Sequence, residues 1–309
     1  MRNIISPNYV FYAGVIWLLF LLTMIMPWTA SAATVDIRYP GLATGLLKSA
    51  VLTPLDKDTL LAADGFSITH SQMLENIQDQ EPKLREQLKK NLFFLLEQEA
   101  VRQVLLSEVQ KAGISVKEGD DSRAIQALFA HRTRDLAVSE EEARAFYAAN
   151  KEMVGSTPFE QVADGIRQYL LKDKQQQAVS AYIDSLGEVT QLRINDKWVE
   201  AQNRLAMDNP VDKARRSDKP TMVEFGAAGC VPCDMMQPIL DKLRKTYPDK
   251  LNVVFVHVRE EQILAARYGI RSIPVQVFYD ASGTEVFRHV GFFAQTEVDK
   301  QLAAMGVKQ

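Results

Sequence analysis

The sequence predicts two folded regions of different class: a mostly helical region, followed by an α/β region with a mixed β-sheet in the last third. Two observations support this division. Apolar residues recur with helical spacing from about residue 69 to residue 186, whereas short β-branched runs alternate with helical segments after residue 218. The chain has 309 residues, which is enough for two ordinary domains and a targeting segment.

The N-terminus carries an apolar run, Val10 to Met26, that contains no charged residue. Ala30-Ser31-Ala32 follows it, and A-x-A is a cleavage pattern of exported proteins. We therefore expect residues 1–32 to be a signal peptide or a membrane anchor, with cleavage favoured. The protein is expected in the periplasm or another extracytoplasmic compartment, with membrane contact only through this segment.

The charge and the cysteine content of the chain limit the functions that it can have. The formal net charge is −3 and no stripe of Lys and Arg is present, so nucleic acid is not an expected partner. The only two cysteines, Cys230 and Cys233, form one C-x-x-C, and a bridge across so short a loop would stabilise the fold little. Zinc needs about four ligands, and the four histidines lie far from this pair. We expect no metal and no cofactor, which leaves redox chemistry.

Residues 33–55 mix glycine, proline and small residues without a sustained period, which predicts a linker. Residues 56–200 form the helical region. Its first element is a predicted hairpin that turns at Asp64-Gly65. A helix is then expected to start at Thr69 or Ser71, whose hydroxyl can cap the first amides.

Longer helices follow. Apolar spacing predicts one helix from Pro82 to Gly113, and Ser139 with Glu142 three residues later is a capping-box pattern. A further helix is predicted over residues 159–186. Residues 190–195 alternate like a strand and are expected to pair with the early hairpin.

This helical region resembles the chaperone portion of SurA/PrsA-type extracytoplasmic foldases, through FYAANKEM, then FEQVADGIRQYLLKDKQQQAVSAYIDSL and the closing LRIN. In that family a parvulin prolyl-isomerase domain commonly separates the two parts. Here only residues 154–158 occupy that position, which is too few for a domain. The resemblance implies a module that holds protein clients without isomerase activity. A helical spacer for the redox domain is the alternative.

A second linker is predicted over residues 201–218, and the α/β domain is placed at residues 209–309. Strands and helices alternate there as expected for a mixed sheet. The predicted elements are a strand at 221–225, a helix at 234–247, a strand at 253–258, a helix at 261–268, strands at 275–279 and 285–290, and a helix at 295–305.

The cysteines lie where a predicted strand passes into a predicted helix. The unpaired amides and the positive dipole end of that helix face Cys230, which favours its thiolate and lowers the pKa of a cysteine thiol below the usual value of about 8.5. Cys233 follows one helical turn later, so its thiol can attack a mixed disulfide formed on Cys230. Between them, Val231 and Pro232 form the active-site loop, which the proline stiffens.

Two segments, VEFGAAGCVPCDMMQPILDKL and ARYGIRSIPVQVFYDASGTEVFRHVGFF, resemble the thioredoxin superfamily over residues 209–309. The resemblance implies a thioredoxin fold with a nucleophile at Cys230 and a resolving thiol at Cys233. It also implies a cis proline at Pro274, with the backbone of Ile273 pairing to an extended client segment and Gly291 flanking that groove. A trans proline that starts a strand is the alternative for Pro274.

Glu224 occupies the position at which thioredoxins carry a buried acid. Its neighbours in the strand are apolar, so burial should raise the pKa of this carboxyl and allow it to relay a proton to or from Cys233. An acid that reaches solvent at the strand end is the alternative. His257 and His289 are expected to have ordinary packing or surface roles.

The chain departs from the family pattern at Gly229, Val231 and Asp234, which replace the usual tryptophan, glycine and lysine. The redox potential and the direction of electron flow therefore stay open. The sequence predicts a thiol–disulfide oxidoreductase, acting as reductase or isomerase on unfolded or disulfide-containing protein clients. A reductase would need a membrane electron donor of the thiol-reductase type. The alternative is a periplasmic chaperone whose thioredoxin domain is mainly a docking module.

Overall fold

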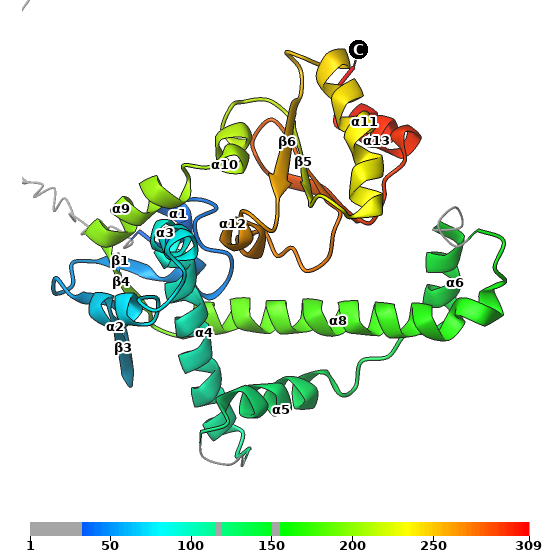
Figure 1. Ribbon diagram of the computed structural model, residues 1–309. Helices are drawn as coiled ribbons and strands as arrows, with labels where there is room; N and C mark the ends of the chain where they lie inside the picture. The colour runs from blue at the N-terminus through cyan, green and yellow to red at the C-terminus, as the bar shows by residue number, and fades with distance from the viewer. Residues whose placement is uncertain (1–32, 115–118, 150–154, 309) are drawn as a thin grey trace, which may run out of the picture. The chain divides into compact units, whose positions relative to one another are not determined.

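The computed structural model describes residues 33–114, 119–149 and 155–308 (Figure 1). The predicted signal peptide or anchor, residues 1–32, lies outside these residues. Within the described part of the chain, no helix combines the length and the apolar character that crossing a membrane requires.

The N-terminal region contains a four-stranded sheet in the order β1-β4-β2-β3. As predicted, β2 and β3 form a hairpin, and the strand that closes the region pairs with it: Ile194 lies opposite Leu61 in an antiparallel register. On its other side, this closing strand runs parallel to β1. The strands are β1 (Val51–Thr53), β2 (Thr59–Ala63), β3 (Phe66–Thr69) and β4 (Arg193–Asn195).

Helices account for most of this region, and two of their predicted ends are confirmed by side-chain caps. Thr69 and Gln72 form a capping box at the start of α2, and Ser139 and Glu142 form another before α6. The helices are α1 (Val35–Arg38), η1 (Leu46–Ser49), α2 (His70–Glu75), α3 (Pro82–Lys90), α4 (Leu92–Lys111), α5 (Asp121–Thr133), α6 (Glu140–Ala149), α8 (Phe159–Val189) and α9 (Asp196–Ala206).

The single helix predicted from Pro82 to Gly113 is instead two helices that meet at Asn91. The backbone of Asn91 leaves the helical region, with φ −116° and ψ 30°, and its side-chain amide donates to the carbonyl of Gln87. Asparagine competes with helix hydrogen bonds in this way, which explains a break that apolar spacing does not reveal.

Residues 33–55, predicted as a linker, are part of the N-terminal core. They form α1, η1 and β1, and Val35 and Leu47 are fully buried. Their elements are three to four residues long, too short to show a period in the sequence. Their anchor is Glu97 on α4, which is 1% exposed. Its carboxylate accepts four hydrogen bonds, two from Thr44 (backbone N and Oγ1) and one each from the amides of Gly45 and Leu47, at 2.8–3.1 Å.

The second sheet has the order β6-β5-β7-β8. The edge strand β6 runs parallel to β5, while β7 is antiparallel to both β5 and β8, so the sheet is mixed as predicted. The strands are β5 (Thr221–Gly226), β6 (Asn252–His257), β7 (Val275–Tyr279) and β8 (Glu285–Val290). The helices are α10 (Pro210–Arg215), α11 (Val231–Thr246), α12 (Gln262–Arg267) and α13 (Gln295–Ala304).

Alternate residues of β5 face two different cores. Met222 packs with α11 and α13 on one face, and Val223 packs with α10 and α12 on the other. The predicted linker at 201–218 contributes to this packing, because α10 lies within it and Val211 is fully buried. Its preceding residue, Asn209, caps α10 by accepting from two backbone amides at 3.0 Å.

We expect Glu97→Leu to lower the free energy of unfolding by about 3 kcal/mol, because it leaves the amides of Thr44, Gly45 and Leu47 without their acceptor. Urea denaturation measures this. Glu86→Gln, at an exposed position of α3, is the control and should change stability by less than about 0.5 kcal/mol. Equal stability of the two variants would contradict the anchoring role.

Candidate active site

The two cysteines form a disulfide bond at the start of α11, with their Cα atoms 5.2 Å apart. Strand β5 ends at Gly226 and residues 227–230 form the connecting loop. Cys230 is the N-cap residue, in an extended conformation, and its carbonyl accepts from the amide of Asp234 at 2.9 Å. The cysteine pair therefore has the strand–loop–helix setting that the sequence predicts.

The two sulfur-bearing residues differ in exposure. Cys230 is partly exposed, whereas Cys233 is only 1% exposed within the first turn of α11. Val231, between them, is 71% exposed. Pro232, in the first helical turn, has no amide proton, so no backbone donor is lost there. A solvent-borne disulfide can thus reach Cys230 and not Cys233.

Helix α11 supplies the electrostatics at Cys230. Its 16 residues direct the positive end of the helix dipole and the first unpaired amides toward this position. Asp234 lies in the first turn and is exposed, so solvent screens much of its opposing charge. The setting favours a thiolate at Cys230 after reduction.

The three residues expected to bind a client lie together at the adjacent strand ends. The Ile273–Pro274 peptide bond is cis, and Pro274 immediately precedes β7. Gly291 follows β8 and donates its amide to the Pro274 carbonyl at 2.8 Å. Its φ of 102° is a backbone conformation that glycine adopts readily and other residues rarely do.

Glu224 is fully buried, which excludes the alternative that it reaches solvent. It lies on the face of β5 that packs against α11, one pleat from Gly226. A Cβ atom at Gly226 would lie 3.4 Å from Cβ and 3.5 Å from Sγ of Cys233, so Cys233 covers that strand position directly. Glu224 is therefore the next residue beneath the resolving cysteine.

Burial raises the pKa of Glu224 to about 8, and a hydrogen bond from Gln276 partly opposes this rise. The cross-strand neighbours explain both effects. Phe255 on β6 and Gln276 on β7 lie opposite Glu224 in register. The Phe255 ring is apolar, while the Gln276 amide donates to Oε2 of Glu224 at 2.9 Å. Sequence reasoning missed both residues, since pairing across strands is not visible in a linear pattern.

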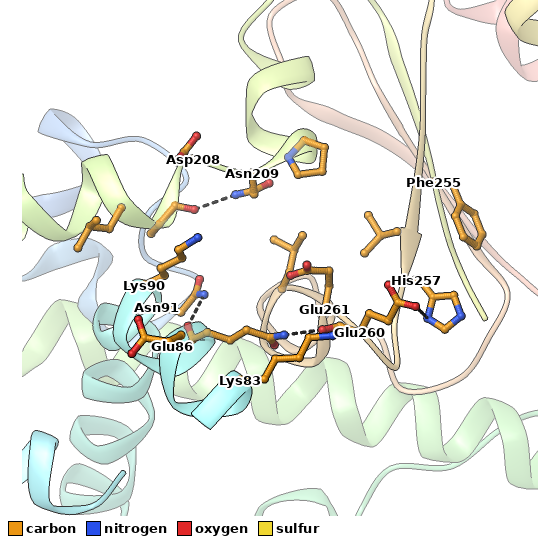
Figure 2. A pocket seen from close by; sticks show the side chains of 16 residues that line it. Lys83, Glu86, Lys90, Asn91, Asp208, Asn209, Phe255, His257, Glu260 and Glu261 are labelled. Carbon is orange, nitrogen blue, oxygen red and sulfur yellow. Dashed lines mark hydrogen bonds and ion pairs between the residues drawn. The ribbon is translucent and has the colours of Figure 1, made fainter. Parts of the chain in front are cut away.

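His257 also contributes to the site, beyond the packing role predicted for it. Its Nε2 atom accepts a hydrogen bond from the amide of Ala228 at 3.2 Å, in the loop before Cys230. Figure 2 shows the Glu260 carboxylate beside the imidazole ring, with Oε1 3.9 Å from Nδ1. Both residues line a pocket of about 630 Å³ that also includes Lys83 and Lys90 of α3. His289, by contrast, stacks on Phe293 with ring centroids 4.3 Å apart.

Comparison with known proteins agrees with this geometry. The thioredoxin family model matches residues 202–304. A thioredoxin from Alicyclobacillus acidocaldarius is 33% identical over 96 residues, which cover 31% of this chain and 90% of that protein. Thioredoxin 1 from Nostoc sp. is 37% identical over 86 residues, which cover 28% of this chain and 79% of that protein.

Among solved structures, a mutant thioredoxin from Halobacterium salinarum matches with 26% identity and a TM-score of 0.29, covering 31% of this chain and 81% of that one. The assignment rests on the sequence matches and on the C-x-x-C pair at the β5–α11 junction. The chain therefore belongs to the thioredoxin family, and its C-terminal domain is a thiol–disulfide oxidoreductase.

Proposed function

We propose that this protein is an extracytoplasmic thiol–disulfide oxidoreductase that reduces or isomerises disulfides of protein clients. The observation that carries the proposal is the asymmetry of the cysteine pair. Cys230 is accessible at a helix N-terminus, and Cys233 is buried one turn behind it over a buried acid. This asymmetry separates an attacking sulfur from a resolving one.

The reaction balances as two exchanges. The Cys230 thiolate attacks a client disulfide, forming a Cys230–client bond and releasing one client sulfur as thiolate. Cys233 then loses its proton and attacks Cys230 Sγ, which releases the second client thiolate and forms the Cys230–Cys233 disulfide. Two electrons pass to the client. A second dithiol must reduce the pair again, and we propose a membrane donor of the thiol-reductase type for this step.

Client binding is assigned to Ile273, Pro274 and Gly291. Ile273 is partly exposed, and its backbone can pair with an extended segment of any sequence, as in strand addition. The residues on either side of Gly291, Val290 and Phe292, are 46% and 39% exposed. Apolar contacts of this kind suit an unfolded client better than a folded one.

Glu224 is assigned to proton transfer with Cys233. A carboxyl whose pKa lies at about 8 exists in both protonation states near neutral pH, which is the condition under which a group can both accept and return a proton. Its place beneath Cys233 puts it on the resolving step rather than on the first attack.

Export is supported by the apolar run at residues 10–26 and the A-x-A pattern at residues 30–32. Protein disulfides form and persist in such a compartment, so disulfide-containing client proteins are present there. N-terminal sequencing of the protein from cell fractions tests this assignment, since a cytoplasmic protein with an intact N-terminus would contradict it.

We also propose that the helical region holds protein clients. The hairpin of α6 and α8 has a small core of its own, which includes Phe159 and Ile166. On its surface, Tyr169 is 52% exposed and its ring lies 5.3 Å from that of Phe146. We propose that this aromatic pair contacts apolar segments of unfolded clients. A spacer without client contact is the competing reading.

For the redox function, Cys230→Ser should reduce the rate of client disulfide reduction to the uncatalysed background. Cys233→Ser should still attack and should accumulate a client mixed disulfide, visible by non-reducing electrophoresis. In the reduced wild type, iodoacetamide should alkylate Cys230 well before the buried Cys233. Equal alkylation rates, or a Cys230→Ser variant as fast as wild type, would refute the assignment.

For Glu224, Glu224→Gln should remove the step near pH 8 from the rate profile of the resolving reaction. The variant should also change stability. Folding raises the pKa of Glu224 from 4.5 to about 8, so its contribution to stability is complete below about pH 4.5 and is lost as pH rises through 8. The free energy of unfolding of the oxidised variant should therefore equal that of the wild type near pH 5. At pH 9 it should be higher than that of the wild type, by on the order of 4 kcal/mol. If the stabilities of wild type and Glu224→Gln changed with pH in parallel, the raised pKa of Glu224 would be contradicted.

For client holding, the full chain carrying both Cys230→Ser and Cys233→Ser should still suppress aggregation of a denatured protein, because holding does not need the thiols. Adding Tyr169→Ser should weaken that suppression. Val189→Ser, at a 75% exposed position on the same helix, is the matched control and should leave it unchanged. Light scattering measures the effect, and a redox-inactive chain that suppresses nothing favours the spacer.

A further inference from the structure

Gln276 is a buried polar residue that the thioredoxin motif does not assign. It lies in the middle of the sheet core on β7, where its side chain is 0% exposed, as is that of Glu224. The two residues are directly opposite each other in the antiparallel β5–β7 register, on the face covered by α11 and α13. A buried amide in this setting is costly unless it is hydrogen-bonded.

The Gln276 side chain makes one hydrogen bond among the described residues. Its Nε2 atom donates to Oε2 of Glu224 at 2.9 Å. Oε1 of Glu224 is buried and has no hydrogen-bond partner among the described residues. Gln276 thus fixes one carboxyl oxygen and leaves the other without a competing donor.

The side chains around Glu224 limit the groups that can exchange a proton with its Oε1 atom. Strand β6 contributes Phe255 and strand β7 contributes Gln276, neither of which titrates. Helix α11 contributes Cys233, above the next residue on this face of β5. The other buried members of this core from α11 and α13 are apolar except Tyr247, which lies at the far, C-terminal end of α11. On β8, His289 lies opposite Gln276, one strand further from Glu224. Once the disulfide is reduced, the Cys233 thiol is the titratable group directly above the next residue on the Glu224 face of β5.

We propose that Gln276 is a positioning residue for the resolving step: it holds Oε2 of Glu224 so that Oε1 is the oxygen that takes the proton from Cys233. The inference rests on the proton-transfer role proposed above for Glu224. In the step, the Cys233 S–H bond breaks and the proton passes to Oε1. The sulfur pair of electrons then forms the bond to Cys230 Sγ, and the client leaves as thiolate.

Gln276 also adjusts the proton affinity of the carboxyl it holds. The hydrogen bond from Nε2 lowers the pKa of Glu224 against the larger effect of burial, which raises it. Without that donor, the carboxylate would be harder to form and a smaller fraction would be ready to accept a proton at neutral pH. A merely structural glutamine would leave the pH dependence unchanged.

The test uses single-turnover release of a client mixed disulfide by the full chain, measured from pH 5 to pH 10. Gln276→Leu should shift the alkaline midpoint upward by about one pH unit, and the rate at pH 7 should fall about tenfold. Gln276→Met is a second variant of similar volume, for use if the leucine variant folds poorly. Gln202→Leu, which removes another buried glutamine from α9, is the matched control and should keep the wild-type profile.

A double-mutant cycle separates this inference from the role of Glu224 itself. In a Glu224→Gln background, adding Gln276→Leu should shift nothing further, because the carboxyl is gone. If Glu224→Gln alone leaves the profile unchanged, the proposed function of Glu224 fails. Two other outcomes overturn the positioning role of Gln276 and leave the proposed function of Glu224 standing. In the first, Glu224→Gln alters the pH profile and Gln276→Leu does not. In the second, Gln276→Leu shifts the profile equally in both backgrounds.

Discussion

The register of β5 against its two neighbours is the constraint on which the active site depends. Side chains alternate between faces along a strand, so Glu224 shares a face with Gly226 and lies beneath Cys233. The same register places Phe255 and Gln276 on either side of the carboxyl. A slip of one residue would turn Glu224 toward α10 and α12 and bring Val223 beneath the cysteines.

The disulfide consequently connects two different environments. At Cys230, helix amides and solvent stabilise negative charge. At Cys233, a thiolate would form close to a carboxyl in a core that excludes water. Two negative charges there would repel each other, so one proton shared between these two groups is favoured over none. The role proposed for Glu224 therefore concerns the release of the client rather than its capture.

Most elements of this fold could be predicted because they carry their own local signal. Strand β7 and strand β8 have the bounds that alternation and turn residues predict, and the C-x-x-C, the acid and the proline lie in contiguous motifs. The residues that sequence reasoning missed act through distant partners. Gln276 meets Glu224 across 52 positions, and His257 meets Ala228 across 29. The linker prediction for residues 33–55 is wrong for a related reason, since the residue that anchors them, Glu97, lies on α4.

Two fully buried glutamates show how the surroundings of a carboxyl decide its use. Both oxygens of Glu97 accept two hydrogen bonds each, so its position is fixed and it anchors residues 44–47. Glu224 receives one hydrogen bond, and its second oxygen is unpaired among the described residues. A carboxyl whose oxygens each accept two hydrogen bonds is fixed in place, whereas one with a single donor keeps an oxygen available for another partner. The number of donors thus distinguishes the acid that anchors the N-terminal core from the acid that we propose exchanges a proton with Cys233.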